Sequence, residues 1–91
     1  MNTPFVTASA VDAALRSALA PTHLEVRDDS AAHAGHAGAR EGSHLSVHIV
    51  SARFAGSSRI TRHRLVYDAL RELIPLGIHA LAIDARTPDG T

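Results

Sequence analysis

Histidine is the residue type with the widest chemistry in this sequence: the 91-residue chain contains seven histidines and no cysteine. A neutral imidazole can bind iron, zinc, copper or nickel through a ring nitrogen. Without cysteine, the chain supplies no thiolate nucleophile, no disulfide and no thiolate-based metal site of its own. The seven positions are His23, His33, His36, His44, His48, His63 and His79.

Two of these histidines, His33 and His36, lie three residues apart in a glycine-rich stretch, and His44 follows where a strand is predicted. The three could bind Zn²⁺, Ni²⁺ or Cu²⁺ directly. A stretch without helical or strand periodicity is a poor preorganised site, so we expect adventitious binding only. The strand histidines are expected to be surface or packing residues: His23, His48 and His79.

No catalytic motif is present in the sequence. It has no Gly-x-x-x-x-Gly-Lys phosphate loop, no His-Glu-x-x-His and no Gly-x-Ser-x-Gly. The adjacent carboxylates Asp28 and Asp29 would face opposite sides of a strand, which favours a role in a turn. We therefore predict that the protein is not an enzyme.

The elements that must position these histidines begin with a helix over residues 9–20, with Ser9 as its N-cap and Pro21 ending it. Alternation of apolar and polar residues predicts strands over 24–27 and 45–49. Between them, residues 30–43 contain no large apolar side chain and three glycines, which predicts a flexible hairpin loop.

Residues 51–58 are typical of a turn anchored by Phe54. An amphipathic helix is predicted over 59–73, ended by Pro75 and Gly77. Its apolar stripe comprises Ile60, His63, Val66, Tyr67, Leu70, Leu73 and Ile74. The last strand, 78–83, is nearly all apolar, and we expect it to be buried on much of both faces.

The resulting order is α-β-β-α-β, in which the third strand can return parallel to the second. This predicts an α+β fold: a small three-stranded mixed sheet with helices on one face. Length and the 45% apolar content indicate one domain over residues 1–91, with its core at about 9–88. No apolar run approaches the roughly 18 residues of a membrane span, and residues 1–5 lack signal-peptide character. We expect a cytoplasmic protein.

Taken in order, several short segments of the sequence resemble the BolA family. The resemblance covers about residues 9–88 and implies a fold like the type II K-homology domain, in agreement with the predicted order. The segments are Leu24-Glu25-Val26, Asp29-Ser30, His33, Ser43-His44-Leu45, Ile49-Val50-Ser51, Arg53-Phe54, Gly56, Arg62-His63-Arg64-Leu65-Val66-Tyr67 and Ile78-His79-Ala80-Leu81.

The resemblance also implies a partner, a monothiol glutaredoxin, in a heterodimer that bridges a [2Fe–2S] cluster. In that family the ligands are a histidine of the Arg-His-Arg segment and a histidine or cysteine of the hairpin loop. Here they fall on His63 and His33, with His36 as the less favoured substitute. Glutathione and the glutaredoxin would supply the thiolates, so no cofactor is expected in the isolated chain. Arg62 and Arg64 suit contacts to a carboxylate or to glutathione.

Position alone favours a different role for His63, that of a half-buried helix residue with a satisfied hydrogen bond. The resemblance also implies an alternative function, because some family members are described as transcriptional regulators of cell shape and stress response. Phosphate contacts could come from five arginines, of which the first four are the predicted contacts: Arg53, Arg59, Arg62, Arg64 and Arg71.

Three features of the sequence argue against strong nucleic-acid binding. The formal net charge is zero, all nine basic residues are arginine, and only 3% of residues are aromatic. The turn Gly56-Ser57-Ser58-Arg59 also lacks the second glycine of the K-homology clamp. We therefore expect weak DNA binding at most.

Overall fold

A computed structural model describes residues 6–29 and 43–91 and confirms the predicted order of elements. The helices are α1 (Ala8–Leu19) and α2 (Arg59–Ala69), and the strands are β1 (His23–Asp28), β2 (Ser43–Val50) and β3 (Ile78–Arg86). Two single-turn 3₁₀ helices, η3 (Ala52–Phe54) and η4 (Ile74–Leu76), precede and follow α2 along the chain. Among these helices, none is long and apolar enough to cross a membrane.

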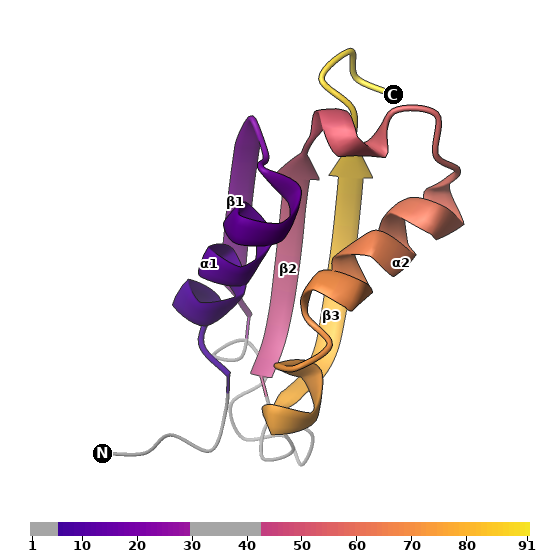
Figure 1. Ribbon diagram of the computed structural model, residues 1–91. Coiled ribbons are helices and arrows are strands. Elements are labelled where there is room, and N and C mark those ends of the chain that lie inside the picture. The colour runs from indigo at the N-terminus through magenta and orange to yellow at the C-terminus, as the bar shows by residue number, and fades with distance from the viewer. Residues whose placement is uncertain (1–5, 30–42) are drawn as a thin grey trace.

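The three strands form one mixed sheet in the order β1-β2-β3, with β1 antiparallel to β2 and β2 parallel to β3. Both helices pack on the same face of this sheet, α1 against β1 and α2 against β3 (Figure 1). The predicted α+β class, with helices on one face, is therefore confirmed. The opposite face, which we call the open face, carries no helix of the described chain.

Strand alternation builds the core between the two layers. Every second residue of β2 is buried: Leu45, Val47 and Ile49. The remaining buried apolar side chains come from the helices, from β1 and from the turn after β2, and they form one cluster: Val6, Val11, Leu15, Leu19, Leu24, Phe54, Val66 and Leu70. Phe54 is fully buried, which confirms its predicted role as an anchor under the turn.

Helix α1 begins one residue earlier than predicted, because Thr7 and not Ser9 is its N-cap. The Thr7 hydroxyl accepts a hydrogen bond from the backbone N–H of Ala10 at 3.1 Å. The helix ends at Leu19, and Ala20 follows in the left-handed region with φ 44°. Pro21 then excludes another helical turn, as predicted.

Helix α2 is shorter than predicted and is rotated differently. It ends at Ala69, and the predicted stretch to residue 73 continues as turns. Its buried side is centred on Val66 and Leu70, whereas Ile60 is 72% exposed and Tyr67 is 42% exposed. The first turn of α2 lies beyond the β3 edge of the sheet (Figure 1).

The prediction that the last strand is buried on both faces is wrong. β3 extends to Arg86 and forms an edge of the three-stranded sheet. Its side chains alternate: Leu81 and Ile83 pack toward the helices, and Ala82 and Asp84 are exposed on the open face. The prediction failed because alanine counts as apolar in the sequence, although the alanines at every second position of this strand are exposed.

The predicted hairpin loop falls mostly outside the described residues, which omit 30–42. Ser43, placed at its end by the sequence, is the first residue of β2. The described residues that flank it, Asp29 and Ser43, lie at the end of the sheet where β2 and β3 begin, since Ser43 pairs with Ile78.

Ser51 joins three segments at the opposite end of the sheet. Its side chain is fully buried, and its hydroxyl donates to the carbonyl oxygen of Leu19 at 2.6 Å. The same oxygen accepts from the N–H of Arg53 at 3.1 Å, and the Ser51 N–H donates to the carbonyl of Arg86 at 3.0 Å. The Leu19 carbonyl belongs to the last turn of α1, where intrahelical partners are lacking.

Replacing Ser51 with alanine should destabilise the fold by about 1–3 kcal/mol, because it leaves the buried Leu19 carbonyl and the Arg53 N–H without these partners. The measurement is the free energy of unfolding from chemical denaturation. Ser57→Ala is the matched control, expected within about 0.5 kcal/mol of wild type, since no hydrogen bond of the Ser57 hydroxyl occurs within the described chain. Equal stability of the two variants would contradict the role given to Ser51.

Candidate functional site

A hollow of about 430 Å³ lies between the first turns of α2 and the last residues of β3. We call it the α2–β3 hollow. Helix α2 contributes two arginines and a histidine, and β3 contributes one acid–base pair. Its lining residues are Arg59, Arg62, His63, Ile83, Asp84, Ala85, Arg86 and Thr91.

Arg62 is half-buried, and its guanidinium is held by main-chain oxygens from three segments. Nε donates to the carbonyl of Ser57 at 3.1 Å, and Nη1 donates to the carbonyl of Ala85 at 3.2 Å. Nη1 also donates to the main-chain oxygen of Thr91. The expectation that Arg62 contacts glutathione, a carboxylate or DNA stays a prediction, and the structure adds that Nε and Nη1 of Arg62 already donate to main-chain oxygens of the fold.

Thr91 is positioned by a turn that depends on Asp89. The Asp89 carboxylate accepts hydrogen bonds from the hydroxyls of Thr87 and Thr91 and from the Thr91 N–H. These bonds, that from Thr87 most of all, lower the pKa of Asp89 to about 2. The carboxylate is therefore ionised at neutral pH, and its contribution to this turn is lost only as pH falls below the ordinary carboxyl range toward 2.

The acid of the hollow, Asp84, is shared by two basic partners. Arg86 donates from Nε at 2.9 Å, and His48 Nδ1 lies 3.0 Å from the other carboxylate oxygen. The hydrogen bond from Arg86 is the main cause that lowers the pKa of Asp84, and the one from His48 adds to it. Asp84 is thus ionised and engaged on both sides at neutral pH.

His63 lies on the border between the buried and exposed sides of α2 and lines the hollow. No hydrogen bond or ion pair joins its ring to any described residue. The purely structural expectation was a histidine with a satisfied hydrogen bond, and the described structure contains no such bond. Both ring nitrogens are therefore available to an external partner.

The hairpin histidines His33 and His36 lie outside the described residues, so their positions relative to His63 are not fixed by the structure. The register of the sheet gives the distance along the strands from the hairpin end of the sheet to the hollow that His63 lines. Asp84 of the hollow pairs with His48, four residues along β2 from His44 at the hairpin end. At about 3.3 Å per strand residue, the hollow is about 13 Å from that end of the sheet.

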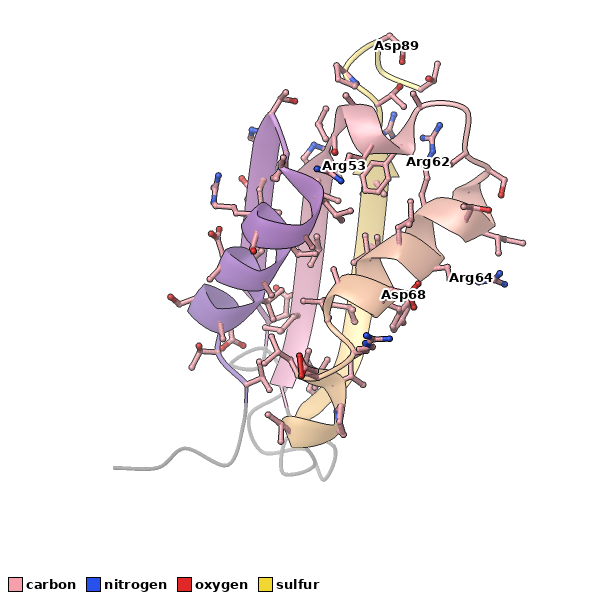
Figure 2. The ribbon with its side chains drawn as sticks, viewed as in Figure 1. Arg53, Arg62, Arg64, Asp68 and Asp89 are labelled. Atoms are coloured by element: carbon pink, nitrogen blue, oxygen red, sulfur yellow. The ribbon has the colours of Figure 1, made fainter. Side chains whose placement is uncertain are left out.

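The arginines singled out in the sequence do not form one surface (Figure 2). Arg59 lines the hollow beside Arg62, whereas Arg53 is exposed on η3 near the end of α1. Arg64 extends from α2 away from the sheet. The structure therefore brings together Arg59, Arg62 and His63 and separates Arg53 and Arg64 from them.

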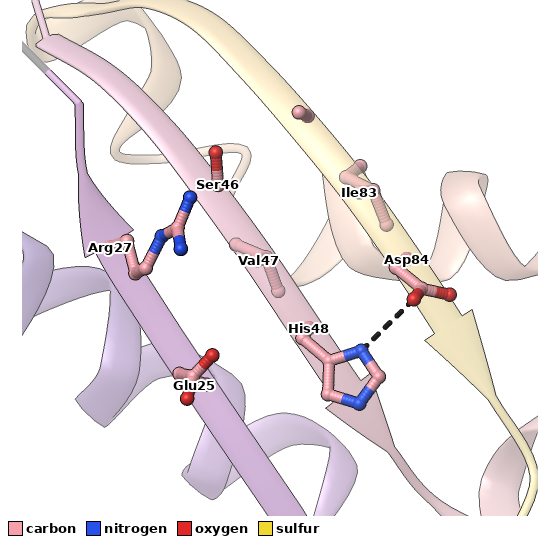
Figure 3. A pocket seen from close by; sticks show the side chains of 8 residues that line it. Glu25, Arg27, Ser46, Val47, His48, Ile83 and Asp84 are labelled. Carbon is pink, nitrogen blue, oxygen red and sulfur yellow. Dashed lines mark hydrogen bonds and ion pairs between the residues drawn. The ribbon is translucent and has the colours of Figure 1, made fainter. Parts of the chain in front are cut away.

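A second hollow, of about 380 Å³, lies on the open face and was not foreseen from the sequence (Figure 3). Glu25, His48 and Asp84 lie directly opposite one another on the three strands. The His23 and His48 rings approach edge to face, with centroids 5.4 Å apart. The expectation that His23 is a surface residue is confirmed, while His48 is half-buried and paired with Asp84. Within residues 6–29 and 43–91, no group of three or more histidine, aspartate or glutamate side chains could hold a metal ion.

Comparison with known proteins adds a family to this geometry. The family model described as BolA-like protein matches residues 15–90. BolA-like protein 1 of Mus musculus is 48% identical over 80 residues, which cover 88% of this chain and 57% of the mouse protein. The DNA-binding transcriptional regulator BolA of Escherichia coli (strain K12) is 40% identical over 77 residues, covering 85% of this chain and 71% of that protein.

Among solved structures, the BolA domain of SufE1 from Arabidopsis thaliana superposes with a TM-score of 0.79 at 44% identity, covering 90% of this chain and 92% of that domain. The match of the family model over most of the sequence agrees with this likeness of fold. The chain therefore belongs to the BolA-like family.

Proposed function

We propose that this chain is a non-enzymatic accessory protein that partners a monothiol glutaredoxin in binding, sensing or transferring a [2Fe–2S] cluster. The observation that carries the proposal is His63, a half-buried imidazole that lines a hollow and has no hydrogen-bond partner in the described structure. The [2Fe–2S] cluster and the monothiol glutaredoxin are what the resemblance to the BolA family implies. Membership of that family therefore supports the choice of both.

The donor set of the chain suits only part of a cluster's coordination. Iron–sulfur clusters are commonly held by four thiolates, but two histidines can replace two thiolates on one iron. A chain without cysteine can offer imidazoles alone. A cysteine of the glutaredoxin and the thiol of glutathione would complete the set, so the cluster would belong to the complex and not to the isolated chain.

Chain length permits a hairpin histidine to approach His63. His33 is four residues from Asp29, so its Cα can lie up to about 14 Å from the Asp29 Cα. The hollow lies about 13 Å along the sheet and two strands, about 10 Å, across it, so the imidazole side chains would have to cover the remaining distance. His36 is seven residues from Asp29 and from Ser43, which gives it more reach. His33 remains the proposed loop ligand, and the span makes His36 a serious substitute.

The register also identifies the variant that tests the helix ligand most sharply. The backbone of His79 follows Ile78, which pairs with Ser43 at the hairpin end of the sheet. A cluster at the α2–β3 hollow would use His63, and His79→Ala is the variant that tests the alternative of a cluster at the hairpin end of the sheet.

The cytoplasmic location predicted from the sequence remains a prediction. One plant relative, SufE-like protein 1 of Arabidopsis thaliana, carries the words chloroplastic/mitochondrial in its name, so relatives of this chain are not confined to one compartment.

Mixing the purified chain with a monothiol glutaredoxin that carries a reconstituted [2Fe–2S] cluster and glutathione should change the visible absorption and circular dichroism of the cluster. A heterodimer should appear in gel filtration. The physical reason is exchange of thiolate for imidazole on one iron, which alters the charge-transfer bands and raises the reduction potential. An unchanged spectrum together with no heterodimer would refute the proposed function.

His63→Ala should abolish the spectral change, because it removes one nitrogen ligand. His33→Ala should do the same, while His36→Ala should leave the change intact. His23→Ala is the matched control, since it removes an exposed imidazole on the open face. Loss of the change in His79→Ala but not in His63→Ala would move the ligand from helix to strand and contradict the assignment of His63.

DNA binding is the second candidate, favoured by the name of the Escherichia coli relative. It predicts that the chain alone retards a promoter fragment in a gel and that added glutaredoxin has no effect. Replacement of Arg62 is unsuitable as a test, because Arg62 maintains the fold. The exposed pair Arg53 and Arg64 should instead be changed to alanine together, which should weaken binding and its salt dependence.

Arg16→Ala provides the control for the DNA experiment, since it removes an exposed arginine that belongs to α1 and not to α2 or the turn before it. If Arg16→Ala weakens DNA binding as much as the double variant does, the attraction is diffuse and electrostatic and does not depend on a specific surface. Retardation that requires the glutaredoxin would also count against DNA binding by the chain alone.

A further inference from the structure

The α2–β3 hollow holds more positive charge than the fold uses. Arg59, Arg62 and Arg86 line it together with His63, and Asp84 is the one acidic side chain among its lining residues. We propose that this hollow is a binding site for a small oxyanion, a phosphate or carboxylate group carried by a small molecule. The proposal goes beyond the proposed function, because it needs neither the glutaredoxin nor a cluster.

Arg59 is the main free cation of the site. It is the first residue of α2, and no hydrogen bond or ion pair to its side chain occurs within the described residues. Its guanidinium can therefore present two parallel N–H groups to an oxyanion. The position at the start of an 11-residue helix adds the partial positive charge of that helix end.

Two further guanidinium groups are held in place around the hollow. Arg62 uses Nε and Nη1 for main-chain oxygens, and Arg86 uses Nε for Asp84 and Nη1 for the Gly90 carbonyl at 3.5 Å. Each guanidinium has five N–H groups, so the Nη2 groups of both remain for a ligand. Because these side chains are already fixed, an oxyanion would lose little free energy in ordering them.

The acid in the hollow offsets the charge of Arg86 and leaves those of Arg59 and Arg62. Asp84 is occupied by Arg86 and by His48, which approaches from the open face. Arg59 and His63 remain unpaired within the described chain, and His63 can donate a further hydrogen bond from a ring N–H. Arg53 and Arg64 lie apart from the hollow (Figure 2), so the arginines do not form one continuous track for a DNA backbone. The grouping of Arg59, Arg62 and Arg86 around one hollow of about 430 Å³ favours a small molecule.

The test is a titration of the ¹⁵N-labelled full chain with inorganic phosphate at pH 7.5, followed by ¹H–¹⁵N correlation spectra. Sodium chloride at the same ionic strength serves as the reference. Saturable shifts are expected at residues 59–63 and 83–86. Arg59→Gln should raise the dissociation constant about tenfold, the loss typical of a hydrogen bond between charged groups.

Arg64→Gln is the matched control, because it removes an exposed arginine of the same helix outside the hollow. It should change the dissociation constant less than about twofold. A parallel titration with succinate distinguishes carboxylate from phosphate as the preferred oxyanion.

Three results would overturn the proposal: shifts that chloride reproduces, shifts that do not saturate, or equal weakening by Arg59→Gln and Arg64→Gln. Thermal unfolding of both variants verifies that they fold. Phosphate binding without any glutaredoxin complex would refute the proposed function alone, and a glutaredoxin complex without saturable oxyanion binding would refute this inference alone.

Discussion

The parallel pairing of β3 with β2 is the constraint on which the rest of the structure depends. Two parallel neighbours cannot be joined by a tight turn, so the chain between them must cross the covered face of the sheet. Helix α2 makes that crossing and starts beside the end of β3. The crossing alone brings Arg59, Arg62 and His63 against the last residues of β3.

Arg62 shows how a charged side chain can serve the fold within a candidate site. Its guanidinium joins the turn before α2, the last part of β3 and the segment after it, all through main-chain oxygens. The main-chain oxygens of Ser57, Ala85 and Thr91 thereby each accept a hydrogen bond. The same bonds hold one wall of the hollow in position, so the fold and the site share a single interaction.

The two ends of the sheet separate the two chemical regions of the molecule. Asp29 and Ser43 flank the hairpin where β2 and β3 begin, and the α2–β3 hollow lies toward the end of β3. A cluster that uses a histidine from each region must bridge this length, whereas one at the hairpin end need not. Which histidines could bind the proposed cluster therefore depends on how far the hairpin extends along the sheet.

Local patterns in the sequence were sufficient to predict the order of elements, the alternation of β2 and the anchor Phe54, because each depends on neighbouring residues. The family followed from the resemblance of several short segments taken in order. Local patterns also placed His63 on α2. The rotation of α2 was decided by tertiary packing, since a stripe that includes Ile60 and Tyr67 has helical spacing whichever side meets the sheet. The bonds of Arg62 to Ala85 and of Asp84 to His48 were likewise undetermined by the sequence, because hydrogen bonds between residues more than 20 positions apart exist only once the strands and helices have packed.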